Sequence, residues 1–279
     1  MKKKAVKWIL LGIFVIISVC VTIIFTTKRK EVSADTLITS LKEYGSNNII
    51  NSDISININT KMSSEWLGND TRYFLPENVI APDVIDIDFI NTTTSQSNDD
   101  AAYVETNIEY NVCDCNKSLD KGYSYLDRNK KILYESFDNE NWYKMEYTDS
   151  SNMELLSEFA AAIDNTGLRT DKKGYILEGN IGFKDIVNIY TNTFDDIIPD
   201  VTFPIEISFD KSLCPYKLEI SASDKTNEYD IKVDIIMNFN NENKDIIIPE
   251  DVQNKAIAYD NSSTDINIDE VIEKYKENK

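Results

Sequence analysis

The stretch DISININTKM, residues 53–62, decides the fold class of this 279-residue chain. Every second position in it, from Ile54 to Met62, is apolar or a threonine, and the positions between are polar. Because successive side chains of a β-strand point to opposite faces of a sheet, this period predicts a strand that is buried on one face only. The apolar face of such a strand needs a covering layer.

The same period of two residues recurs along most of the chain. Turn-prone runs at 128–130 and 138–141 separate the middle segments, and connections this short predict antiparallel neighbours. Pro249 is expected to stop the last strand, because proline cannot donate a hydrogen bond to a neighbouring strand. Besides 53–62, strands are predicted at 85–89, 104–112, 122–127, 132–137, 142–147, 201–209, 216–222 and 229–239, and within 246–252.

Four segments have the period of a helix instead. In the first, Asp35 is placed to cap the N-terminus of the helix and Gly45 to end it. Ser151 and Glu154 form the S-x-x-E capping box of the second. The order of helices and strands predicts an α+β fold, a curved antiparallel sheet or half-barrel whose one face is covered by helices. The apolar residues of the four helices lie within 37–44, 155–163, 183–194 and 268–275.

A transmembrane helix is predicted near the N-terminus. Trp8 to Thr27 is a run of 20 residues without a charge. A helix of that length spans about 30 Å, the thickness of a hydrocarbon core. A cleaved signal peptide and a lipidated Cys20 are the alternatives, although Val19 is larger than the small residue that a lipobox places before its cysteine. We expect a single-pass protein of the cell membrane, with its N-terminus inside and the remaining domain extracytoplasmic, on a bacterial cell surface.

The charge of the chain argues against nucleic acid as a partner. Seven of its 29 cations precede residue 31, where there is no acid, so the rest of the chain sets 22 cations against 48 acids. Such a surface repels phosphate backbones. The chain also has no histidine, the side chain most used for acid–base catalysis near neutral pH and for binding metals. We therefore expect no enzymatic activity, no cofactor and no metal.

Two short motifs, together with a membrane-proximal helix, carry a resemblance to a known family. The motifs are SFDNENWYKM, residues 136–145, and IPEDV, residues 248–252. In these features the chain resembles exported lipoproteins with a LolA/LppX-like half-barrel, over about residues 35–256. The resemblance implies an apolar cavity between sheet and helices that accepts a lipid or another hydrophobic ligand. The chain departs from that family because it lacks a convincing lipobox, so a transmembrane helix would replace the lipid anchor.

The expected organisation has three parts. Residues 1–30 form a cytoplasmic tip and the membrane anchor, residues 31–256 form the extracytoplasmic half-barrel-like domain, and residues 257–279 form a linker and a C-terminal helix. The ligand would lie against apolar side chains of the predicted strands and of the second helix. The residues expected to line its cavity are Ile54, Ile56, Ile58, Val104, Ile108, Tyr110, Leu155, Phe159, Ile205, Ile207, Ile231 and Val233.

Three cysteines follow the predicted anchor, Cys113, Cys115 and Cys214. In an exported domain, a disulfide from either member of the C-x-C pair to Cys214 is reasonable, and free thiols are the main alternative. Metal or redox chemistry is a third interpretation. Three cysteines without a histidine, however, are short of the four ligands of a tetrahedral metal site.

Aromatic residues gather in the predicted meander. Cross-strand packing accounts for such a cluster, and a groove for a lipid or glycan is the functional alternative. The sequence as a whole favours a binding protein for a hydrophobic ligand. An interaction module of an envelope complex, with a filled core, is the alternative. The aromatic cluster comprises Tyr123, Tyr125, Tyr134, Trp142, Tyr143 and Tyr147.

Overall fold

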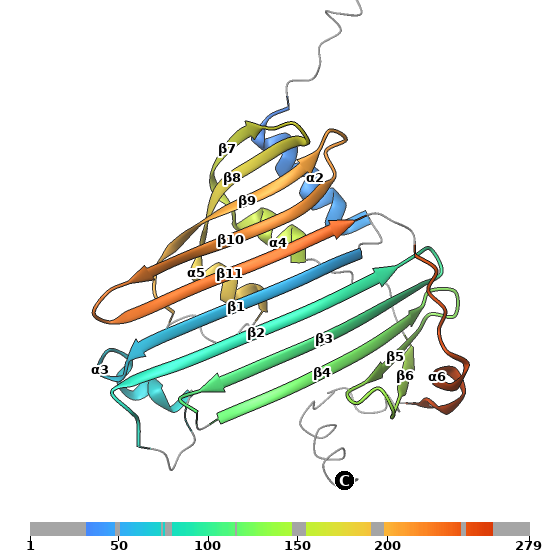
Figure 1. Cartoon of the computed structure of the whole chain (residues 1–279), viewed down its shortest axis with the longest axis horizontal. Coiled ribbons are helices and arrows are strands. Elements are labelled where there is room, and N and C mark those ends of the chain that lie inside the picture. The colour runs from blue at the N-terminus through green and yellow to red at the C-terminus, as the bar shows by residue number, and fades with distance from the viewer. Residues whose placement is uncertain are drawn as a thin grey trace, which may run out of the picture.

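The computed structural model describes residues 32–47, 51–73, 75, 80–114, 116–146, 155–190, 198–240 and 244–258. It is mostly β-structure, with twelve strands in one open, largely antiparallel sheet and a few short helices (Figure 1). The strands are β1 (Asn51–Ser63), β2 (Val84–Ser97), β3 (Ala101–Val112), β4 (Asn116–Asp127), β5 (Ile132–Ser136), β6 (Tyr143–Glu146), β7 (Asp164–Thr170), β8 (Gly174–Gly182), β9 (Thr202–Asp210), β10 (Pro215–Lys225), β11 (Tyr229–Asn240) and β12 (Ile257–Ala258). The helices are α2 (Ala34–Asn47), α3 (Ser64–Leu67), η1 (Gly68–Tyr73), α4 (Leu155–Ala162), α5 (Phe183–Tyr190) and α6 (Glu250–Lys255).

The sheet consists of two meanders that meet at its centre. The strand order is β12-β6-β5-β4-β3-β2-β1-β11-β10-β9-β8-β7. The chain passes through β1 to β6 in sequence order on one side, and through β7 to β11 on the other. Most of these connections are short, but α3 and η1 lie between β1 and β2, and α5 lies between β8 and β9. The pairing of β1 with β11 joins the two halves over the whole length of β1. The predicted antiparallel sheet is therefore confirmed.

Pairing in register places alternate residues of every strand on two faces. Ile56 of β1 lies opposite Asn91 of β2 on one side and opposite Ile235 of β11 on the other. We call the face that carries Ile56 the inner face, and the face that carries its neighbour Asn57 the outer face. Along β1 the inner residues are buried and most outer residues are exposed or half-buried, as the alternation in residues 53–62 predicts.

Helices α2, α4 and α5 pack on the inner face of the half of the sheet that runs from β1 to β7 (Figure 1). Leu37 and Leu41 of α2, Phe159 of α4 and Ile186 of α5 have no exposed surface. Burying one such side chain contributes roughly 1.5–3 kcal/mol to folding. We call this assembly the main core. Its strand residues are Ile54, Ile56, Ile58, Leu177, Ile181, Phe203, Ile205, Ile207, Phe209, Leu218, Ile220, Ile231, Val233, Ile235, Met237 and Phe239.

The C-terminal segment covers the opposite face at the other end of the sheet. Ile248, just before α6, and Val252, within α6, are buried against Tyr134 of β5 and against Trp142. Tyr134 lies on the outer face, so α6 and the three helices of the main core cover opposite faces of the sheet. Pairing of β12 with β6 extends the sheet two residues beyond the predicted domain boundary at 256.

Three predicted element boundaries are wrong. Residues 246–248 form no strand, because Pro249 is the N-cap of helix α6 and Ile248 turns into the cluster under that helix. Helix α2 continues past Gly45 to Asn47. Its N-cap is Ser33 and not the predicted Asp35, which lies inside the helix; the Ser33 hydroxyl accepts a hydrogen bond from the Thr36 amide at 3.2 Å.

The hairpin β7–β8 was not predicted from the sequence. Strand β7, with the sequence DNTGLRT, lies at the edge of the sheet, and all its residues are exposed or half-buried. A strand that buries neither face has no reason to alternate apolar and polar residues.

Part of the predicted helix 183–194 is confirmed as α5. Residues 191–194, the capping box at Ser151 and Glu154, and the C-terminal helix lie outside the described residues.

The turn between β5 and β6 is held by one carboxylate. Asp138 accepts hydrogen bonds from the amides of Glu140 and Asn141 at 2.9 and 2.8 Å, from the Asn141 side chain at 2.7 Å, and from the Ser136 hydroxyl at 3.0 Å. Partial burial disfavours the charged form, but these hydrogen bonds outweigh it and lower the pKa of Asp138 well below its usual value.

Replacing Asp138 by alanine is expected to lower the free energy of unfolding by about 1 kcal/mol, because the turn amides lose their acceptor. Since the folded-state pKa of Asp138 lies below that of the unfolded chain, its contribution is complete above about pH 4 and is lost as the pH falls below that value. Urea unfolding at pH 7 and pH 3 measures both effects. A loss that is equal at the two pH values would contradict this account of Asp138.

Candidate functional site

The helices of the main core leave the inner face of β2 and β3 partly exposed. Across the pairing, Ile56 has no exposed surface, whereas its neighbour Asn91 on β2 and the next residue in that row, Ile108 on β3, are half-buried. We call this surface the inner strip. Its side chains are Phe89, Asn91, Thr93, Val104, Thr106, Ile108 and Tyr110.

The inner strip has a polar middle between two apolar parts. The Thr93 hydroxyl donates a hydrogen bond to the side-chain oxygen Oδ1 of Asn91 at 3.0 Å and lies 3.0 Å from the Thr106 hydroxyl. On one side of this group lie Phe89, Ile108 and Tyr110, and on the other lies Val104. Burial, and secondly the nearby Cys113, raise the pKa of Tyr110, so its phenol stays neutral and able to donate a hydrogen bond at physiological pH.

The pairing register brings the ten strand residues predicted to line a cavity onto one face of the sheet. Ile54, Ile56, Ile58, Val104, Ile108, Tyr110, Ile205, Ile207, Ile231 and Val233 all lie on the inner face. Leu155 and Phe159 belong to α4, which packs on that face. The twelve residues therefore belong to one side of the molecule, but they divide into two groups of different burial.

The first group is buried inside the main core and comprises Ile54, Ile56, Ile58, Phe159, Ile205, Ile207, Ile231 and Val233. Ile56, Phe159, Ile207 and Ile231 have an exposed fraction of 0%. A side chain without accessible surface borders no void large enough to hold a water molecule. These four residues are therefore packing residues in this conformation. Val104, Ile108, Tyr110 and Leu155 remain half-buried.

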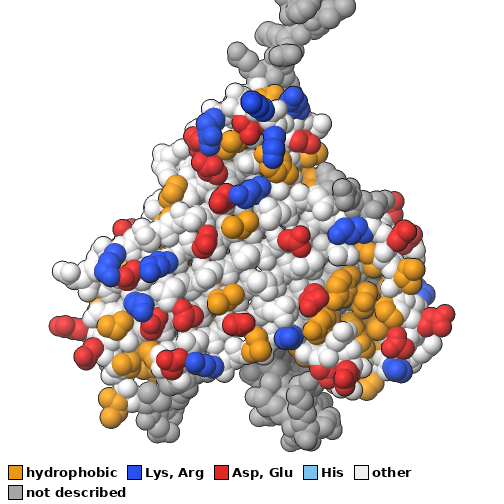
Figure 2. Space-filling view, in the orientation of Figure 1, with side chains coloured by type: hydrophobic (Ala, Val, Ile, Leu, Met, Phe, Trp, Pro, Cys, Tyr) orange, Lys and Arg blue, Asp and Glu red, His pale blue; other side chains and the backbone are white. Residues whose placement is uncertain are grey.

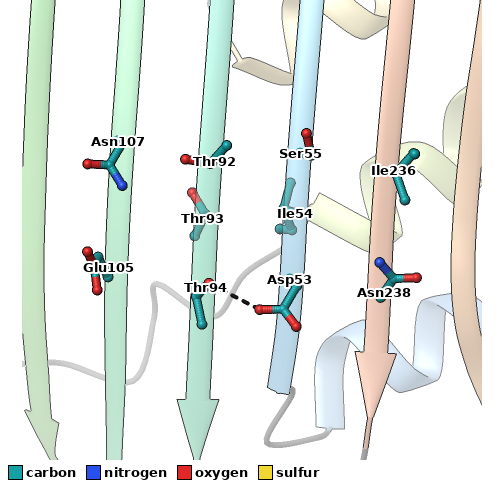
Figure 3. A pocket seen from close by; sticks show the side chains of 10 residues that line it. All are labelled: Asp53, Ile54, Ser55, Thr92, Thr93, Thr94, Glu105, Asn107, Ile236 and Asn238. Carbon is teal, nitrogen blue, oxygen red and sulfur yellow. Dashed lines mark hydrogen bonds between the residues drawn. The ribbon is translucent and has the colours of Figure 1, made fainter.

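A shallow depression on the outer face was not predicted from the sequence (Figure 3). It has a volume of about 320 Å³ and lies over the centre of the sheet, where β1, β2, β3 and β11 run side by side. The Thr94 hydroxyl donates a hydrogen bond to Asp53 at 3.1 Å across it. Its lining residues are Asp53, Ile54, Ser55, Thr92, Thr93, Thr94, Glu105, Asn107, Ile236 and Asn238.

In the sequence, this depression corresponds to the polar positions of the alternating strands, which face outward. Its outer-face positions carry hydroxyl, amide and carboxylate groups, together with Ile236. Figure 2 shows the surrounding outer face as mainly uncharged, with scattered charges of both signs. Polar side chains of this kind are usual on the solvated face of an antiparallel sheet, so the depression alone specifies no ligand.

The predicted aromatic cluster lies under α6. The rings of Tyr103 and Tyr125 have centroids 4.8 Å apart, and those of Tyr125 and Trp142 lie 5.4 Å apart. Trp142 and Tyr134 are buried against the C-terminal segment, whereas Tyr123 and Tyr125 are half-buried. Cross-strand packing, one of the two expected explanations, accounts for this arrangement. Tyr143 is on the inner face of β6, and residue 147 lies outside the described residues.

Two of the three predicted bridging cysteines can be placed. Cys113 carries a free thiol in the turn after β3, where its backbone has a φ of 50° and its sulfur accepts a hydrogen bond from the Asp86 amide at 3.3 Å. It therefore forms no bridge to Cys214, which is half-buried beside the main core. Cys115 lies outside the described residues, and a bridge from it stays a prediction.

The described residues contain no group of three or more Cys, Asp or Glu side chains arranged to hold a metal ion. Among the helices of these residues, none is long and apolar enough to cross a membrane. The predicted span from Trp8 to Thr27 lies outside them. No protein-family model matches the chain, and a search of curated proteins finds no significant relative.

Proposed function

We propose that this chain is a membrane-anchored cell-surface protein that binds a hydrophobic ligand, a lipid or lipid-like molecule, without catalysing a reaction. The observation that carries the proposal is the unequal cover of the inner face. Three helices fill one half of it with a packed core, while the inner strip on β2 and β3 keeps apolar side chains partly exposed. In the proposed half-barrel, curvature of the sheet encloses a ligand over this strip.

The side chains of the inner strip favour an amphipathic ligand over a purely apolar one. Phe89, Ile108 and Tyr110 offer apolar contact, which contributes about 25 cal/mol for each Å² removed from water. The hydroxyls of Thr93 and Thr106 offer hydrogen bonds in the middle of the strip. A lipid with an ester or hydroxyl group near its acyl chains matches this pattern.

Attachment to the membrane is the second part of the proposal. The uncharged segment from Trp8 to Thr27 would cross the bilayer once, and only a short tether separates it from the start of α2 at Ala34. The domain would then lie outside the cell, close to the bilayer from which a lipid ligand comes. Such a tether suits a receptor or a local carrier better than a long-range shuttle.

An interaction module of an envelope complex is the second candidate function. It is favoured by two exposed isoleucines beside the C-terminal edge of the sheet, Ile247 with 82% of its surface exposed and Ile257 with 63%. Exposed large apolar residues at a sheet edge are typical of contacts with another protein. In this alternative the inner strip carries no ligand.

Replacing Ile108 by glutamate tests the ligand site. A carboxylate on the inner strip would be desolvated by a bound acyl chain, so we expect the amount of co-purifying lipid to fall at least tenfold. The measurement is organic extraction and lipid mass spectrometry of the full chain, purified from the membranes of its own host. Native mass spectrometry of the same preparation gives the stoichiometry.

The matched control is Asn107→Glu, which adds the same charge to the neighbouring position on the outer face of β3. It should leave the lipid content unchanged. Equal loss in both variants would point to a general effect of charge on β3, and equal retention would place the ligand elsewhere. A wild-type chain that carries no lipid and takes up none would refute the binding function and favour the interaction module.

A further inference from the structure

We propose that the narrow end of the domain rests on an anionic lipid surface through three lysines. Lys172 and Lys173 lie in the turn between β7 and β8, and Lys211 lies in the turn between β9 and β10. All three are exposed. The inference rests on the proposed membrane anchor, because the anchor determines which end of the domain faces the bilayer.

The two turns are held side by side by the sheet. Gly174, directly after the first turn, pairs with Asp210, directly before Lys211. The backbones approach so closely that a Cβ atom on Gly174 would lie 2.6 Å from the carbonyl carbon of Asp210. The three ammonium groups therefore belong to one small region of the surface.

The acidic residues of these turns, Asp171 and Asp210, accept hydrogen bonds from the turn backbone, and each still adds a negative charge beside the three lysines. Asp171 accepts hydrogen bonds from the amides of Lys173 and Gly174 at 2.7 and 2.8 Å, and the bond from Gly174 contributes most to lowering its pKa. Asp210 accepts hydrogen bonds from the amides of Ser212 and Cys214 at 2.7 and 2.9 Å.

Some lysines of the sheet are paired with carboxylates of the described residues, and the three lysines of these turns are not. Lys61, Lys217 and Lys225 are each paired with a carboxylate. Within the described ranges of the chain, Lys172, Lys173 and Lys211 form no ion pair. Lys173 instead lies over the ring of Tyr216, with its ammonium nitrogen 5.8 Å from the ring centroid. The whole chain has a net charge of −19, so cations without an ion pair are unusual on it. Such cations are free to contact an anionic partner.

Helix α2 connects these turns to the predicted membrane anchor. The helix begins at the narrow end of the domain, and Figure 2 shows several Lys or Arg side chains there. Its Ser40 hydroxyl donates a hydrogen bond to the carbonyl of Leu213, in the β9–β10 turn, at 2.9 Å. Burial first, and then Cys214 and Asp210, raise the pKa of Tyr44 to about 12, which reflects the same close contact.

The tether limits how far this end can move from the bilayer. The predicted span ends at Thr27 and α2 begins at Ala34, so even a fully extended connection reaches only about 25 Å. Lysines near an anionic membrane each strengthen the contact by roughly fivefold, and the attraction fades over a Debye length of about 8–10 Å. The lysine-bearing end is therefore within reach of lipid head groups.

Amide hydrogen exchange of the full chain in vesicles tests the proposal. Exchange in peptides covering the two turns is compared between vesicles of phosphatidylcholine alone and vesicles that also contain phosphatidylglycerol. We expect the turn amides to exchange at least threefold more slowly in the anionic vesicles, and high salt to remove the difference. The triple variant Lys172→Gln, Lys173→Gln and Lys211→Gln should also lose it.

A second triple variant removes the same number of cations from elsewhere on the domain, through Lys121→Gln, Lys232→Gln and Lys255→Gln. It should keep the protection, and equal loss in both triples would overturn the proposal, as would equal exchange in the two kinds of vesicle. Flotation after an alkaline wash tests the anchor separately. A chain that washes off but still shows lipid-dependent protection would refute the anchor and support the lysine contact.

Discussion

Replacing Phe159 by alanine is expected to lower the free energy of unfolding by about 3–5 kcal/mol. Phe159 is the central residue of α4 in the main core, and none of its surface is exposed. Leu156 and Ala160 on the same helix are also buried, so the structure around the deleted ring has little freedom to collapse into the space. Urea unfolding of the full chain in detergent, followed by circular dichroism, measures the loss.

Phe137→Ala is the matched control for this substitution. Phe137 lies in the turn after β5 with 45% of its surface exposed, so its removal should change the free energy of unfolding by less than about 1 kcal/mol. If Phe159→Ala cost as little as the control and increased lipid uptake, α4 would cover a ligand cavity instead of a packed core. The expected result is a large loss of stability with no change in bound lipid.

The strands that the sequence predicted most closely are those that bury one face along their whole length. In β1 and β11 many inner-face apolar residues are opposed by another across the pairing, as Ile56 is by Ile235. The alternation is then a direct record of burial. Strand β7 gives the opposite case. At the sheet edge neither of its faces is buried, so its residues are not constrained to alternate.

The location of the candidate site depended on information that the alternation does not contain. Ile108 and Ile207 have the same position in the pattern of their strands, and both lie on the inner face. Only Ile207 lies under the helices of the main core, and it is fully buried where Ile108 is half-buried. Which half of a sheet the helices cover is set by long-range packing, and no local period reports it.

The C-terminal segment differs from its predicted strand for a related reason. Ile246, Ile248 and Val252 resemble a short strand in sequence, yet Ile248 and Val252 are buried, and Ile246 is half-buried, in the cluster that contains Tyr134 on the outer face. Pro249 disfavours pairing with a strand but is well suited to begin a helix. Recognising this helix required knowing that the aromatic side chains of β4 and β5 needed a cover on the face opposite to the main core.

Replacing Gly174 by alanine is expected to lower the free energy of unfolding by about 3 kcal/mol or more, the upper range for overpacking. A Cβ atom at this position would overlap the carbonyl oxygen of Phe209 and lie 2.6 Å from the carbonyl carbon of Asp210. These are backbone atoms of the paired strand β9, so no rotation of a side chain can make room. The hairpin β7–β8 would have to separate from β9, and urea unfolding would detect the loss.

Gly122→Ala provides the matched control, because Gly122 also lies within a strand, β4, and no atom lies within 4 Å of a Cβ placed there. Alanine at this position should leave the stability unchanged or raise it by about 0.5–1 kcal/mol, since glycine loses more conformational freedom on folding. Equal stability of the two variants would mean that β8 and β9 do not approach as closely as described. In that case the two lysine-bearing turns would also lie farther apart than described. The proposed membrane contact therefore depends on this result.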